Sequence, residues 1–90
     1  MAKKSATPTE KRYLERVAGL GCIICNAPAN VHHIREGQGV GMRASHYLTI
    51  PLCREHHQGE FSIHNSRREF QNVYGNELDL LAKTIQMLSS

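Results

Sequence analysis

Residues 50–57 read IPLCREHH, a short apolar run that ends in a cysteine and, three residues later, a histidine. A second spaced pair, Cys22-x2-Cys25, stands earlier in the chain. A spacing of two residues lets a tight turn aim both side chains at one ion, and three thiolates with one imidazole are a common tetrahedral zinc set. We therefore expect a structural Zn²⁺ bound by Cys22, Cys25, Cys53 and His56.

The sequence leaves two alternatives to this zinc set. With Ile23 and Ile24 between them, the first two cysteines would also suit a buried apolar turn in which each thiol is a small hydrophobic group. His57 follows His56 directly and could supply the fourth ligand in its place. The distribution favours the metal, because all three cysteines of the chain fall in the two pairs.

Length, charge and cysteine count bound the class of protein. Ninety residues predict one domain over 7–90, behind a disordered tail over 1–6. Such a chain buries only about 60–65% of its unfolded surface, so a structural metal would supplement a thin core. The odd number of cysteines, and the lack of an apolar signal segment or membrane span, predict a cytoplasmic protein that does not enter the membrane. The net charge of +3 is compatible with a nucleic-acid partner.

Cap and turn signals predict helices on both sides of two short strands. TPTE at 7–10 is a capping box that begins a helix reaching about Ala18. Strands are expected over 29–34 and 47–52, joined by a glycine-rich loop over 35–45. Because this loop lacks the spacing of a dinucleotide fingerprint, we expect its glycines to supply positive φ angles instead.

The second strand and the last helix carry the clearest apolar patterns. Leu48, Ile50 and Leu52 alternate along the strand, as in a sheet with one face on the core. Two further helices are expected over about 66–74 and over 77–88. In the last helix, four residues at helical spacing are expected to face the core: Leu78, Leu81, Ile85 and Leu88.

All six histidines lie between positions 32 and 64. Three imidazoles with open positions can hold a divalent metal and still admit a phosphate oxygen and water. A further, unligated imidazole can accept a proton near neutral pH, and this division of labour suits phosphodiester hydrolysis. Adjacent strand residues point to opposite faces, so for His32 and His33 to share one site the strand must end, twist or bulge there. The candidates are His32, His33, His57 and His64.

The motifs CIIC, VHHI and IPLCREHH, followed by IH, together resemble the HNH nucleases that carry a zinc ribbon. The similarity is closest to the recombination-enhancement, RecA-dependent nucleases of phages, and it spans Gly21 to Leu81. The resemblance implies a small α+β, zinc-stapled ββα-metal domain with flanking N- and C-terminal helices. It further implies a metal-dependent DNA endonuclease or nickase, with DNA as substrate and a RecA filament as a candidate partner in a bacterial or phage-infected cell.

The resemblance also implies roles for matching positions. In members with paired histidines the first binds the metal and the second is the general base, which assigns His32 and His33. His57 and His64 match the remaining ligands of the active-site ion, and the cysteine pairs with His56 match the structural zinc set. Three imidazoles suit Zn²⁺, Ni²⁺ or Mn²⁺ better than Mg²⁺, and the choice among the four ions stays open.

The middle Asn of the HNH name has no match, because no Asn lies between His33 and His57. His46 and Tyr47 are the nearest candidates for its place, and the sequence does not choose between them. Several arginines surround the histidines in sequence, and a guanidinium suits bidentate phosphate contact. Those expected to contact nucleic acid are Arg35, Arg43 and Arg54; Arg67 and Arg68 are equally consistent with solvated helix charges.

Two other classes of function compete with the nuclease. A noncatalytic zinc module that binds nucleic acid or a protein partner needs only the cysteine pairs and the basic loop. A metal-binding accessory protein needs no nucleic acid at all. Both leave His32, His33, His57 and His64 without a role, so the nuclease hypothesis ranks first.

Overall fold

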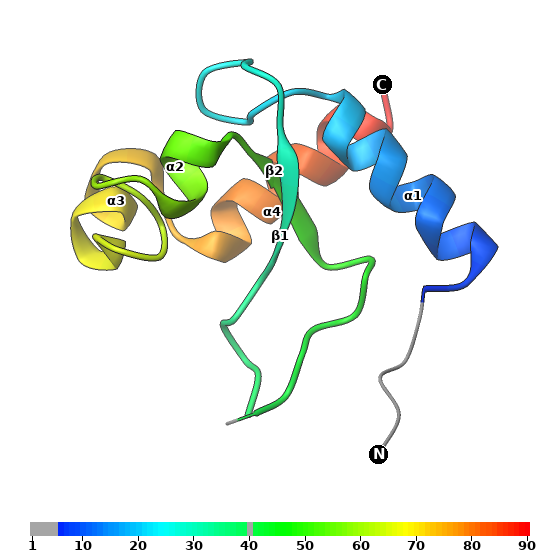
Figure 1. The fold of residues 1–90 in the computed structure, drawn as a ribbon, viewed down its shortest axis with the longest axis horizontal. Coiled ribbons are helices and arrows are strands. Elements are labelled where there is room, and N and C mark those ends of the chain that lie inside the picture. Colours follow the sequence, from blue (N-terminus) through cyan, green and yellow to red (C-terminus); the bar gives the residue numbers. More distant parts are fainter. Residues whose placement is uncertain (1–5, 40) are drawn as a thin grey trace.

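A computed structural model describes residues 6–39 and 41–90, and Figure 1 shows a central pair of strands with helices around it. This arrangement confirms the expected α+β class, while the expected tail lies, apart from Ala6, outside the described residues. In chain order the elements are α1 (Pro8–Gly19), β1 (Asn30–His33), β2 (Thr49–Leu52), α2 (Arg54–Gln58), α3 (Arg67–Tyr74) and α4 (Glu77–Leu88).

Capping boxes begin both long helices. The Glu10 N–H donates to the Thr7 hydroxyl at 3.1 Å, and the Thr7 N–H donates to the Glu10 carboxylate at 2.8 Å, as the TPTE run predicts. Asn76 and Asp79 form the equivalent pair at α4. After α1 the chain turns through Gly21, where φ is +79° and an added Cβ would lie 3.0 Å from the backbone oxygen of Asn26, so this position requires glycine.

The strands pair antiparallel, with register from Asn30 opposite Leu52 to His33 opposite Thr49. Both are shorter than expected from the sequence. All four residues of β2 are buried, so the predicted alternation of one buried and one exposed face is wrong. The reason is that β2 is covered on several sides: α1 and α4 pack against it, and the Ile23 N–H donates to the Pro51 oxygen at 2.9 Å.

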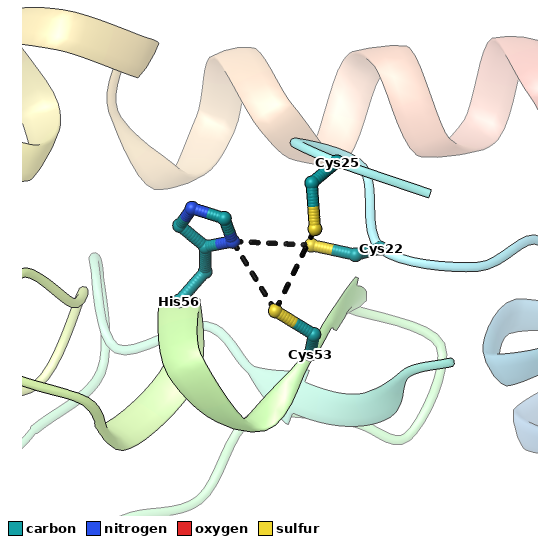
Figure 2. A group of neighbouring side chains, drawn as sticks. All are labelled: Cys22, Cys25, Cys53 and His56. Atoms are coloured by element: carbon teal, nitrogen blue, oxygen red, sulfur yellow. Dashed lines mark hydrogen bonds between the residues drawn. The ribbon is translucent and has the colours of Figure 1, made fainter. Parts of the chain in front are cut away.

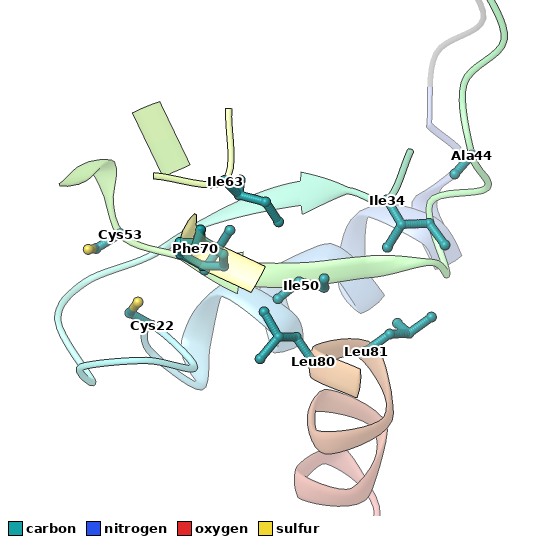
Figure 3. Close-up of a cluster of buried hydrophobic side chains, with 10 residues drawn as sticks. Cys22, Ile34, Ala44, Ile50, Cys53, Ile63, Phe70, Leu80 and Leu81 are labelled. Atoms are coloured by element: carbon teal, nitrogen blue, oxygen red, sulfur yellow. The ribbon is translucent and has the colours of Figure 1, made fainter. Parts of the chain in front are cut away.

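The hydrophobic core lies between the sheet, α3 and α4. Figure 3 shows Phe70 inside it, with Cys22 and Cys53 at one end, so the core continues directly into the sulfur ligands. In α4 the prediction for the apolar face is wrong at two positions, because Leu78 and Ile85 are 49% and 46% exposed. The helix is rotated to bury a different stripe instead, made of Glu77, Leu80, Leu81 and Thr84.

Two candidate metal centres and the cleft beside them

Cys22, Cys25, Cys53 and His56, here called the Cys₃His cluster, place their sulfur and nitrogen atoms within 4.8 Å of one another. Figure 2 shows the four side chains converging. The sulfurs of Cys25 and Cys53 lie 3.7 Å apart. Nδ1 of His56 lies 3.7 Å from the sulfur of Cys22 and 3.2 Å from the sulfur of Cys53. Tetrahedral zinc would separate two sulfurs by about 3.8 Å and a sulfur from a nitrogen by about 3.6 Å. The four atoms therefore fit one zinc ion.

Local backbone geometry builds the Cys₃His cluster. The Cys22 N–H donates to the Ala27 oxygen and the Asn26 N–H donates to the Cys22 oxygen, both at 2.8 Å, which closes a tight turn. Cys53 is the N-cap of α2, so His56 lies on the same side of that helix one turn later. His56, rather than His57, therefore completes the set, which decides the alternative left open by the sequence.

The surroundings of Cys22 lower the pKa of its thiol. Burial raises its pKa, but hydrogen bonds from the backbone of Cys53, Ile24 and Cys25 outweigh this effect. With the nearby His56 they lower the pKa of Cys22 to about 7. Because thiolate is the metal-binding form, this environment favours a cation at the centre of the cluster.

His32, His57 and His64, here called the three-histidine cluster, form a second group whose candidate ligand atoms lie within 4.8 Å of one another. They come from β1, from α2 and from the segment before α3. The Nε2 atoms of His57 and His64 lie 3.0 Å apart, against about 3.4 Å for two nitrogens on tetrahedral zinc. The structure therefore brings together the three residues that the sequence analysis assigned to an active-site ion.

Two members of the three-histidine cluster, His57 and His64, have lowered pKa values. Burial, followed by the neighbouring His32 and His64, lowers the pKa of His57 to about 4. Burial and His32 also lower the pKa of His64. Since a metal binds the neutral imidazole, these shifts favour the ligand form of both rings near neutral pH.

Glu77, which the sequence analysis did not single out, is buried directly behind His32. Because an ionised carboxylate only accepts, Nε2 of His32 donates to Oε2 of Glu77, at 2.6 Å. Burial alone would raise the pKa of Glu77, but this hydrogen bond and further donors lower it to about 2. The only signal in the sequence was that Glu77 lies in register with Leu80, Leu81 and Thr84 at helical spacing.

His33 and His46 form a separate pair beside the three-histidine cluster. Nε2 of His33 lies 2.9 Å from Nδ1 of His46. Burial, and then the charges of His46 and Arg43, lower the pKa of His33. Tyr47 is 42% exposed, and its backbone oxygen accepts from the Tyr13 hydroxyl. Of the two candidates for the missing Asn position, His46 is thus the one that contacts His33.

A cleft of about 390 Å³ opens over the histidines. The strand β1 ends at His33, and both His32 and His33 line the cleft, although adjacent strand residues point in opposite directions. Arg35 and Arg43 also line it, whereas Arg54, the first residue of α2, does not. The loop over the cleft has positive φ at Gly37 and Gly41, as its glycine content predicts. The remaining lining residues are Val31, Ile34, Gly41, Met42, Ala44, His57 and His64.

The fold and these sites define a small α+β chain with two candidate metal centres and a histidine-lined cleft. Over residues 6–39 and 41–90, no helix has the length and apolar character needed to cross a bilayer. Residues 1–89 match the family described as "Protein of unknown function (DUF968)", and the chain belongs to this family.

Among curated proteins, the chain is similar to the uncharacterized protein YdfU of Escherichia coli strain K12. The two are 34% identical over 79 residues, which cover 84% of this chain. The chain spans only 22% of the length of that relative.

Proposed function

We propose that this chain is a metal-dependent DNA endonuclease or nickase of the HNH, ββα-metal type. One observation carries the proposal: the three-histidine cluster and the unligated His33 line the same cleft. A noncatalytic zinc module would need the Cys₃His cluster alone and gives no reason for four histidines to gather at a cleft.

The donor sets fit the two ions that this class of nuclease uses. The Cys₃His cluster supplies four ligands and leaves no open position, which is typical of a structural zinc. His32, His57 and His64 supply three nitrogens and leave positions open towards the cleft, which suits a catalytic divalent ion among Mg²⁺, Mn²⁺, Ni²⁺ and Zn²⁺. When bound, that ion lowers the pKa of water and stabilises charge on the phosphate oxygens.

His33 is the general base in this proposal. In this proposal its Nε2–H donates to Nδ1 of His46, at 2.9 Å, which leaves its own Nδ1 to accept a proton from water. The water oxygen attaches to phosphorus as the bond to the sugar oxygen breaks, and the departing oxygen takes a proton from solvent. The lowered pKa of His33 keeps the ring neutral and able to accept that proton. His46 orients the base, in the place that Asn holds in the family name.

Charge beside the cleft suits the phosphate backbone. Arg35 and Arg43 line the cleft, and in this proposal they bind phosphates next to the scissile one. Arg54 stands on α2 outside the cleft, so in this proposal it contacts DNA beyond the reacting phosphate. A RecA filament remains a candidate partner on the family resemblance alone.

A plasmid-nicking assay tests the proposal. Purified protein is incubated with supercoiled DNA and each of the four divalent ions, with and without RecA and single-stranded DNA. We expect nicking that EDTA abolishes and that His33→Ala reduces by about 10²–10⁴-fold, the usual contribution of a general base. Gln58→Ala, exposed at the end of α2 and outside the cleft, is the control and should nick normally. Tight DNA binding without cleavage under any ion would identify a noncatalytic module instead.

A further inference from the structure

We propose that Glu77 is the positioning residue of the three-histidine cluster, and that its carboxylate turns His32 so that Nδ1 faces the ion. This inference rests on the proposed function and adds to it a residue outside the ligand set. It also predicts which nitrogen of His32 binds the metal.

The hydrogen bonds of Glu77 are divided between its two oxygens. Oε2 accepts from Nε2 of His32 at 2.6 Å. Oε1 accepts from the backbone N–H groups of Arg35 and Glu36, at 2.7 and 2.8 Å, and from the Arg67 guanidinium at 3.1 Å. Oε1 therefore binds two separate parts of the chain, the segment just after β1 and the start of α3. Oε2 binds the imidazole of His32.

This distribution assigns Glu77 a role behind the ligand rather than on the ion. The side chain is 0% exposed, and both of its oxygens accept hydrogen bonds from the protein. Glu77 is also not among the residues whose candidate ligand atoms converge in the three-histidine cluster. Because Nε2 of His32 already donates to Glu77, Nδ1 is the nitrogen of that ring left for an ion. Carboxylate, histidine and metal in this order are a recurring arrangement that sets the tautomer of the ligand.

Glu77→Gln separates this role from simple structural support. If the amide nitrogen of the variant faces Nε2 of His32, the ring must accept there and carry its proton on Nδ1, towards the ion. If the amide is flipped, its nitrogen opposes the N–H groups of Arg35 and Glu36. The first arrangement blocks the ligand atom and the second loosens the loop, so neither reproduces the wild-type site.

The test is a titration of protein carrying one equivalent of zinc, with Co²⁺ as the second ion, followed by absorption and calorimetry. We expect Glu77→Gln to weaken Co²⁺ binding by about 10–100-fold, as other substitutions behind a ligand do, and to retain the first zinc. Asp79→Asn is the matched control: it removes a carboxylate from the same first turn of α4, one that caps the helix instead, and should leave Co²⁺ affinity unchanged.

A second measurement needs no variant. In isotope-labelled wild-type protein loaded with a spin-active cadmium isotope, the ion should couple to Nδ1 of His32, and coupling to Nε2 would overturn the inference. Equal Co²⁺ affinity in wild type and Glu77→Gln would also overturn it while leaving the proposed function intact. Failure of the wild type to take up any second ion would instead remove the proposed active site, and the inference with it.

Discussion

Cys53→Ser should unfold most of the domain. Cys53 is buried, caps α2 and supplies one of four ligands to the Cys₃His cluster. Serine is a better N-cap than cysteine, so the substitution slightly stabilises the helix itself. Any loss of domain stability must therefore come from the loss of zinc binding. Structural zinc contributes about 10–16 kcal/mol in zinc-finger peptides at neutral pH, whereas a domain of this length has only about 5–14 kcal/mol of total stability.

Thermal denaturation followed by circular dichroism, together with zinc analysis, measures the effect. We expect the wild type to hold tightly bound zinc and to unfold cooperatively. The variant should bind no zinc and should lose most of the amplitude of the thermal unfolding transition. Arg54→Ala, an exposed neighbour in neither cluster, controls for substitution at this end of α2. A Cys53→Ser protein that melts at the wild-type temperature would refute the reasoning, because the core alone would then suffice.

Three further predictions concern the cleft. His57→Ala and His64→Ala should each weaken binding of the second ion, measured by Co²⁺ titration, and leave the structural zinc in place. Unchanged titration curves would show that these residues are not ligands of that ion. Arg43→Ala should weaken DNA binding at low salt and reduce the slope of log affinity against log salt by about 1, since one phosphate contact is lost. Arg54→Ala, which lies outside the cleft, should change cleavage less than Arg43→Ala in the nicking assay, and the reverse order would contradict the placement of DNA.

Local signals predicted those parts of the structure that local chemistry determines. The capping box at Thr7 and the cap at Asn76 begin helices where expected, because a cap is decided by a few neighbouring residues. The spacing of the two pairs likewise predicted a cluster, since within each half the two ligands are only three positions apart. The expected HNH identity and catalysis stay predictions.

The missed features all depend on contacts between distant segments. Glu77 has the sequence context of an ordinary acidic residue in a first helical turn, and its partner His32 lies 45 positions away. The stripe of α4 that is buried contains Glu77, and Leu78, which lies next to it, faces solvent although its spacing suits a core position. The burial of both faces of β2 depends on how α1 and α4 pack, and no periodicity within the strand encodes that.

The five-residue helix α2 connects the two candidate metal centres. Successive side chains on a helix diverge by about 100°, and here His56 turns to the sulfur ligands while His57 turns to the cleft. One peptide unit thus joins the two candidate metal centres. In the proposed nuclease, loss of the structural zinc would displace a ligand of the second ion without touching any other residue of the cleft.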